Sequence, residues 1–197
     1  ETIKVRGQLI HAVDAKTRLL LLNKAPATVC SHQNENDIPS VLEAVPKLSH
    51  GKWLMVGRLD VMTTGLLLIT NDGDLAHHFA HPSHGYIREY LVRVDAELTD
   101  LQVKQLVQGI EMEEGLARFE KVTKMRKASG RNHWYKVVLK QGRYRMVRRL
   151  MASVGCEVSR LKRIRFGPFV LDQALGQGKF QEVDAKWLES YLQSKKR

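Results

Sequence analysis

The chain has 197 residues, of which 43% are hydrophobic, and a formal net charge of +11. This length is enough for one large domain or two small ones with a buried core, and no apolar run approaches the roughly 20 residues that cross a bilayer. The two cysteines, Cys30 and Cys156, belong to no CxxC pattern. They predict two core thiols in a reducing cytoplasm rather than a disulfide framework or a metal site.

The positive charge is concentrated in one part of the chain. From Arg118 to Arg165 there are 16 lysines and arginines and two acids, a net charge of +14, which leaves −3 for the other residues. A surface of this sign most commonly faces the phosphate backbone of a nucleic acid. A basic face that only aids solubility is the alternative. An anionic membrane is disfavoured, because the charges follow strand-like alternation rather than one amphipathic helix.

The first eighty residues predict strands followed by one helix. A short strand and turn are expected over 1–10, and a turn-rich loop over 25–40. Three apolar runs predict buried strands over 18–24, 52–57 and 65–70. A helix over 71–82 begins at an Asn-Asp-Gly turn and ends before Pro82.

The remainder mixes strands and helices irregularly. A strand over 85–94 places Arg88, Tyr90, Val92 and Val94 on one face. Further strands are expected over 116–126, 134–140 and 157–167, the last with Val158, Arg160, Lys162 and Ile164 on one face. Helices are expected over 99–109 with a Thr99–Gln102 capping box, over 144–155, and over 184–194 with Asp184 as N-cap. Without a steady βαβ period, this order predicts an α+β fold with a mostly antiparallel sheet flanked by helices.

The stretch GRLDVMTTGLLLITNDG, residues 57–73, presents one carboxylate, Asp60, ahead of a buried strand. An acid in a partly dry place needs a cation to stay ionised, and Arg58 and the arginines of 143–149 are available. So equipped, Asp60 suits a nucleophile or an electrostatic stabiliser. The alternative is a turn aspartate that hydrogen-bonds to nearby backbone.

The stretch GRYRMVRR, residues 142–149, predicts an anion-binding helix surface. Arg145, Arg148 and Arg149 fall at helical i, i+3 and i+4 spacing, and like charges so placed repel unless an anion lies between them. One arginine could also turn inward to pair with a carboxylate. A solvated helix face is the alternative.

Two further groups of side chains have open interpretations. Tyr90, beside Arg88 on an exposed strand face, would suit stacking on a nucleobase, although a core tyrosine facing a helix fits the alternation better. His77 and His81 have the spacing of a zinc pair, but no acid or cysteine completes a set, so a metal site is disfavoured. The sequence has no GxxxxGK or GxGxxG loop, so a nucleotide cofactor is not expected.

Two motifs together resemble one enzyme family. GRLDVMTTGLLLITNDGDLAHHFAHPS followed by REYLVRV, and later QGRYRMVRRLMASVGCEVSRLKRIRFG, are similar in order and spacing to the motifs of the RsuA-type pseudouridine synthases. The resemblance runs from about Leu19 to Phe169. It implies the pseudouridine synthase fold over 16–197, preceded over 1–15 by the tail of an S4-like RNA-binding domain and a linker.

The resemblance also implies the chemistry and the residues that carry it. A uridine flipped out of its RNA is isomerised without cofactor or metal, with Asp60, Tyr90 and Arg148 as catalytic residues. Asp60 is the nucleophilic aspartate, Tyr90 packs on the flipped base, and Arg148 pairs with Asp60. The substrate-binding residues expected beside them are Arg58, Lys24, Arg88, Arg143, Arg145 and Arg149.

The implied partner is ribosomal RNA, with 23S rRNA of the large subunit or an assembly intermediate favoured, and the chain is expected to be a cytoplasmic monomer. Two alternatives remain open. One is a synthase acting on 16S rRNA or tRNA. The other is a non-catalytic rRNA-binding protein of ribosome assembly in which Asp60 is structural.

Overall fold

A computed structural model describes residues 2–5, 8–11, 16–125 and 133–194. Its strands are β1 (Thr2–Val5), β2 (Gln8–His11), β3 (Leu19–Lys24), β4 (Leu54–Met55), β5 (Thr64–Thr70), β6 (Arg88–Val94), β7 (Lys121–Lys124), β8 (His133–Leu139), β9 (Val158–Phe166), β10 (Phe169–Val170) and β11 (Phe180–Glu182). Its helices are α1 (Gly73–Ala80), α2 (Asp100–Gln108), α3 (Met146–Ser153) and α4 (Ala185–Ser194), with 3-10 turns η1 (Val41–Ala44) and η2 (Pro82–His84). No helix among the described residues is long and apolar enough to cross a membrane.

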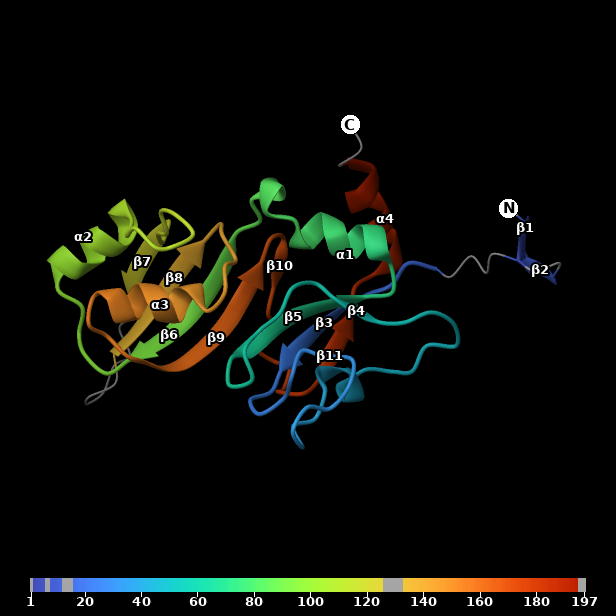
Figure 1. The fold of residues 1–197 in the computed structure, drawn as a ribbon, viewed down its shortest axis with the longest axis horizontal. Helices are drawn as coiled ribbons and strands as arrows, with labels where there is room; N and C mark the ends of the chain where they lie inside the picture. Colours follow the sequence, from blue (N-terminus) through green and yellow to red (C-terminus); the bar gives the residue numbers. More distant parts are fainter. Residues whose placement is uncertain (1, 6–7, 12–15, 126–132, 195–197) are drawn as a thin grey trace.

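One nine-stranded sheet organises the chain, in the order β11-β3-β5-β9-β6-β8-β7, with β4 paired to β5 and β10 to β9 (Figure 1). Strands β1 and β2 form a separate antiparallel pair. Every pairing in the large sheet is antiparallel except that of β5 with β9. The α+β fold with a mostly antiparallel sheet is therefore confirmed.

The parallel contact divides the sheet into two parts. We call β11, β3, β5 and β4 the Asp60 half, because the loop that carries Asp60 leads into β5, and β9, β6, β8, β7 and β10 the basic half. Only two residue pairs join β5 to β9, Thr64 with Lys162 and Gly65 with Arg163. Gly65 has φ +98°, and a Cβ there would lie 2.1 Å from the Arg163 carbonyl oxygen. Glycine is thus required for the two halves to meet.

The two halves bury their strands differently. Strand β5 is buried on both faces, because Leu67 and Ile69 join one core cluster while Leu66 and Leu68 join a second that includes residues of α1 and α4. Strand β6 alternates, with Arg88, Tyr90, Val92 and Val94 on one face as predicted, and that face is buried. That face is covered by α3, which lies in front of the sheet in Figure 1, and by α2, which lies beside β7.

Strand β9 departs from simple alternation. Its register with β6 skips Ser159 and Ile164, so the strand carries two bulges. Between the bulges Leu161 and Arg163 face the core, while Arg160 and Lys162 face the other way. Val158, Arg160, Lys162 and Ile164 were predicted to share one face. This is wrong at both ends of the strand, because each bulge shifts the alternation by one residue. Val158 packs in the core with Leu161.

Several predicted boundaries are also corrected. The strand over 52–57 shrinks to β4, because the chain turns at Gly57 with φ +70°. The strand over 116–126 begins only at Lys121, after a turn closed by an isolated bridge between Ile110 and Ala117; residue 126 lies outside the described part. The edge strands β10 and β11 were not predicted, since each is too short to show a pattern. The Thr99–Gln102 capping box and the Asp184 N-cap are confirmed.

Candidate active site

Asp60 lies in the tight loop between β4 and β5. The loop is closed by the Thr63 N–H, which donates to the Asp60 carbonyl at 3.0 Å. The Asp60 side chain is 36% exposed, and its recorded partner among the described residues is Arg148, whose Nε lies 3.7 Å from Oδ2. The carboxylate is thus aimed across the junction at a guanidinium, and not at nearby backbone as in the turn alternative.

Arg148 is held in place by a second contact. It lies on α3 of the basic half, and its Nη1 donates to the Val158 carbonyl at 2.7 Å. The side chain is 20% exposed. Because one end of the guanidinium is fixed on β9, the other end is oriented toward Asp60. The predicted pairing of an inward-turned arginine with the acid is present in this geometry.

Lys24 holds the Asp60 loop in place through hydrogen bonds to its backbone. Its side chain is fully buried, and Nζ donates to the carbonyls of Ala25, Val61 and Thr63, each at 3.0 Å. Burial lowers the pKa of the ammonium, and the charges of Cys30 and Asp60 oppose that shift. All three of its N–H donors are used to hold the loop in place, and the expectation that Lys24 binds substrate stays a prediction.

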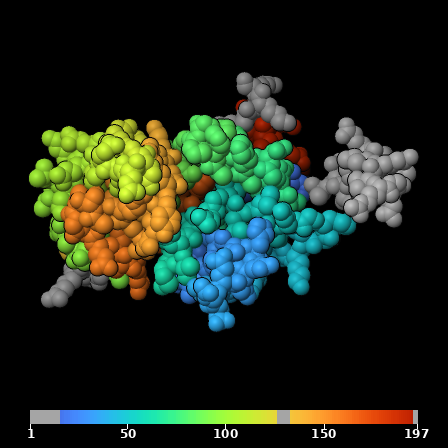
Figure 2. Space-filling model, in the orientation of Figure 1, coloured from blue at the N-terminus to red at the C-terminus, as the bar shows by residue number. Residues whose placement is uncertain are grey.

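A pocket opens beside Asp60 where the two halves meet. Figure 2 shows the front of the molecule hollowed between the teal residues of the Asp60 half and the orange residues of the basic half. Five arginines line it, and Asp60 is the only acid among its lining residues. The five are Arg58, Arg88, Arg143, Arg145 and Arg163. This imbalance of charge suits an anionic ligand.

Tyr90 and Arg88 lie on the inner wall of this pocket. Each is 8% exposed, so the prediction of an exposed strand face is wrong, and Tyr90 also belongs to the core cluster with α3. Arg88 donates to the carbonyls of Tyr86 and Lys140 and lies over the Phe166 ring at 4.7 Å. Burial lowers the pKa of Arg88, opposed by Tyr90 and reinforced by the charge of Arg163.

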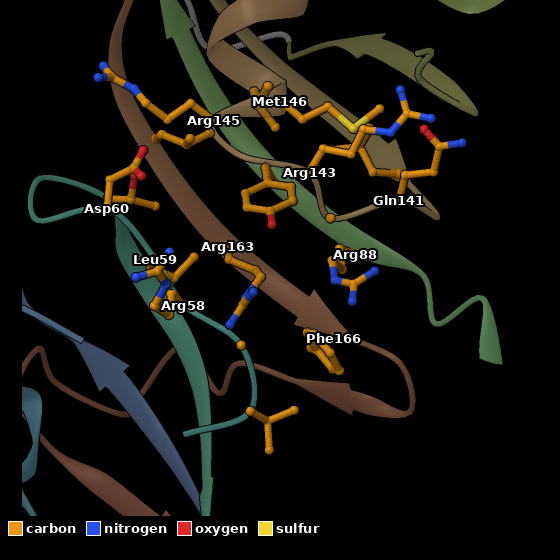
Figure 3. Close-up of a pocket in the computed structure, with 18 of the residues that line it drawn as sticks. Arg58, Leu59, Asp60, Arg88, Gln141, Arg143, Arg145, Met146, Arg163 and Phe166 are labelled. Atoms are coloured by element: carbon orange, nitrogen blue, oxygen red, sulfur yellow. The ribbon is translucent and has the colours of Figure 1, made fainter. Parts of the chain in front are cut away.

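Arg163 is a site residue that the sequence reading did not single out. It is 2% exposed, its Nε donates to the Leu66 carbonyl at 2.7 Å, and its guanidinium lies 5.0 Å from the Phe166 ring centroid. Its Nη2 is buried without a recorded partner among the described residues. In Figure 3 it lies in the middle of the pocket between Asp60 and Arg88. The available signal was an arginine two residues after Leu161, on the apolar face of a strand.

The arginines of 143–149 point in different directions. Arg145 has φ +46° and precedes α3 as its N-cap, so it does not lie on the predicted helix. In Figure 3 the guanidinium groups of Arg143 and Arg145 point away from the pocket centre, and Arg143 Nη1 donates to the Gly115 carbonyl at 2.7 Å. Arg149 pairs with Glu114 through two bonds of 2.9 and 2.7 Å. Arg58 is exposed at the rim of the pocket.

The cysteines lie near the Asp60–Arg148 pair, because the Cys30 sulfur accepts the Leu59 N–H at 3.4 Å and Cys156 lines a hollow together with Arg148. Cys156 is buried and Cys30 is half-buried, both as free thiols, and burial raises the pKa of Cys30. The ring centroids of His77 and His81 are 5.1 Å apart, and those of His78 and His84 are 4.5 Å apart. No group of three or more histidine, cysteine or acidic side chains within the described ranges is arranged to hold a metal ion.

An α+β domain with one carboxylate in an arginine-lined pocket suits an anionic ligand, and comparison with known families identifies the class of protein. The sequence profile of the family described as "RNA pseudouridylate synthase" matches residues 18–153. The chain therefore belongs to the RNA pseudouridylate synthase family, and the resemblance seen in its motifs is confirmed.

Three relatives share the name "Ribosomal large subunit pseudouridine synthase B". Identity is 42% over 192 residues with that of Pseudomonas aeruginosa, 44% over 182 with that of Vibrio cholerae, and 40% over 185 with that of Escherichia coli K12. These alignments cover 96%, 89% and 92% of this chain. The chain spans only 50%, 56% and 63% of the relatives' own lengths.

Solved structures agree with the fold. A crystal structure of a pseudouridylate synthase has a TM-score of 0.76 and 28% identity, covering 92% of this chain and 76% of that one. An archaeal box H/ACA Nop10-Cbf5 complex has a TM-score of 0.56 over 83% of this chain and 52% of that one, at 17% identity, and supports the fold alone.

Proposed function

We propose that this chain isomerises a specific uridine of ribosomal RNA to pseudouridine, most specifically in 23S rRNA. The observation that carries the proposal is the carboxylate of Asp60, paired with Arg148 at the edge of an arginine-lined pocket. Membership of the family and the names of the three relatives support the reaction and the large-subunit substrate.

The reaction rearranges one nucleotide without gain or loss of atoms. The bond from uracil N1 to ribose C1′ breaks, a bond from C5 to C1′ forms, C5 loses a proton and N1 gains one. Asp60 is proposed as the nucleophile, and Arg148 keeps its carboxylate ionised and aimed. The reaction needs a positioned carboxylate and an apolar surface against which the base can pack. Buried strand β5 holds the Asp60 loop, and the core behind Tyr90 supplies the apolar surface.

The pocket is proposed to hold the uridine after it leaves the RNA stack. Tyr90, on the inner wall, packs against the base. Arg88 and Arg163 offer hydrogen-bond donors to its phosphate or carbonyl oxygens, and the unpaired Nη2 of Arg163 is the one best placed to do so. Arg58 and Arg145, exposed at the rim, contact the RNA backbone.

The proposed setting is the cytoplasm, with the chain acting as a monomer on rRNA or on an assembly intermediate of the large subunit. The free thiols of Cys30 and Cys156 support a reducing compartment. Sedimentation at micromolar concentration is the measurement for the monomer; a dimer would contradict that part alone.

The test is release of tritium from 23S rRNA labelled at uracil C5, since that hydrogen leaves on isomerisation. We expect release by the unaltered chain, and a loss of at least ~10⁴-fold in Asp60→Asn with RNA affinity retained. Asp74→Asn, which removes the same charge from the exposed start of α1, is the matched control and should stay active. Activity in Asp60→Asn would refute the mechanism. RNA binding without any release would favour the assembly protein, and release only from 16S rRNA or tRNA would change the substrate.

A further inference from the structure

A second hollow lies behind the Asp60 loop, on the opposite face of the sheet from the pocket. Met62, Thr64, Trp134, Arg160 and Lys162 line it, and loop residue Gln177 closes one side. The alternation of β9 between its bulges places Arg160 and Lys162 on this face, while Leu161 and Arg163 face the pocket. The same junction of the two halves therefore carries a pocket in front and a hollow behind.

This rear face is strongly basic. Across neighbouring strands Trp134, Arg93 and Arg160 lie in one row, and Lys136, Leu91 and Lys162 in the next. Glu89, one row further on, pairs with Lys136 and Arg165. Arg160 is exposed, and Arg93 and Arg160 lie directly opposite each other. Like charges so placed destabilise a sheet unless an anion lies between them.

Apolar and aromatic side chains lie among these charges. Trp134 and Leu91 are half-buried, and Met62 is 63% exposed, which is unusual for a large apolar residue. Bases of unpaired RNA stack on such side chains while lysine and arginine contact the phosphates. A protein partner with an acidic surface would use the charges but would not need this mixture.

The hollow also lies next to the proposed active site. The loop from Asp60 to Thr64 is shared, since Asp60 lines the pocket, and Met62 and Thr64 line the hollow. We propose that the rear hollow binds unpaired RNA flanking the target uridine, so that the strand passes around the Asp60 loop from one face to the other. This rests on the proposed function, because it assigns the flanking part of the same substrate.

The experiment compares two double variants that each remove two positive charges. Arg160→Gln with Lys162→Gln alters the hollow, and Lys104→Gln with Lys186→Gln alters exposed positions on α2 and α4. Affinity is measured over a range of salt for an unmodified 23S rRNA transcript and for versions with progressively shorter flanks around the converted uridine.

We expect the hollow variant to bind the long transcript about ten-fold more weakly than the control, with a salt slope lower by about 1.4, since single strands give about 0.7 per contact. KM rises while kcat is unchanged, and the deficit disappears as the flanks are removed. The melting temperature holds or rises, because the opposition of Arg93 and Arg160 is relieved. Trp134→Leu, as an independent variant, should weaken binding about ten-fold by loss of stacking.

Equal losses in the two double variants, or none in either, would overturn the proposal. A loss that persists without flanks would also overturn it, since the pocket would then be affected directly. These outcomes are distinct from failure of the proposed function. If the unaltered chain releases no tritium, the comparison of affinities is made with nested fragments of the same transcript and still tests the hollow.

Discussion

Strands β5 and β6 sit in the same sheet but meet different surroundings. Strand β5 is covered on both faces and reads as a continuous apolar run, Leu66 to Ile69. Strand β6 is covered on one face only and alternates. The difference shows why charge collects in the basic half. A strand with one uncovered face has room for arginine and lysine, whereas a strand buried twice has none.

The same comparison explains where the site lies. The Asp60 half contributes a carboxylate on a loop that is held by buried groups, and the basic half contributes Arg148, Arg163 and Tyr90. Neither half contains the pair of Asp60 and Arg148 by itself. The site therefore depends on a junction of two residue pairs between β5 and β9.

The largest effect is expected from breaking the pair from the basic side. Arg148→Gln removes the guanidinium that faces Asp60, and kcat should fall roughly 10²–10³-fold, a loss typical of one electrostatic contact in an active site. Arg149→Gln on the same helix is the charge-matched control, because Arg149 pairs with Glu114 instead. Single-turnover tritium release measures both. Equal losses would show that the charge of the helix matters and the pairing does not.

The junction itself can be broken at Gly65. Gly65→Ala places a methyl group 2.1 Å from the Arg163 carbonyl oxygen at a φ of +98°, so the free energy of unfolding should fall by about 3–4 kcal/mol. Gly51→Ala shares the positive φ but has nothing within 4 Å, and should cost only about 1 kcal/mol. Urea unfolding of both variants separates the clash from backbone strain. Similar values would mean that the close approach is unimportant.

Lys24 tests how much the Asp60 half depends on the hydrogen bonds that hold its loop. Lys24→Met leaves three carbonyls without their donor, so stability should fall by roughly 2–3 kcal/mol, and kcat should fall while KM for RNA stays unchanged. Lys52→Met, at an exposed lysine, is the control. A raised KM with unchanged stability would show that Lys24 binds substrate and does not hold the loop.

The smallest effect is expected at Glu114. Its hydrogen bond to Arg149 lowers the pKa of this exposed carboxyl to about 2, so the pair persists at neutral and mildly acidic pH and is lost only as pH falls through about 2. Glu114→Gln should barely change the melting temperature at physiological salt. It should tighten RNA binding a few-fold by freeing Arg149, as a filter-binding titration can show. The neighbouring Glu113→Gln is the control, and a matching change there would mean that only net charge matters.

Much of this architecture could be predicted from the sequence, and the failures have physical causes. Apolar runs predicted β3 and β5, and alternation predicted which residues of β6 share a face. The bulges at Ser159 and Ile164 leave no mark in the alternation, so the face of Val158 was missed. Lys24 looked like a surface lysine because two of its three carbonyl partners, Val61 and Thr63, come from a loop that is distant in sequence.

The site was predicted less completely than the fold. The family resemblance paired Asp60 with Arg148, as the structure places them, whereas residue spacing alone does not say which way each arginine points. Arg145, expected on the helix, caps it with a left-handed backbone, and Arg149 turns to an acid that lies in a loop 35 residues earlier. Arg163 was overlooked because its position depends on a hydrogen bond to Leu66. Leu66 lies on β5, which is far from Arg163 and Phe166 on β9 in the sequence.

The pairing of β11 with β3 has a consequence for how the chain folds. The basic half is one continuous segment, 88–170, whereas the Asp60 half is closed only when β11, near the end of the chain, pairs with β3 and Arg18 meets Glu182. Contacts between residues close in sequence form before those that must close long loops. We therefore expect the basic half to take shape first during synthesis. The carboxylate of Asp60 then acquires its surroundings last, once the two ends of the domain are joined.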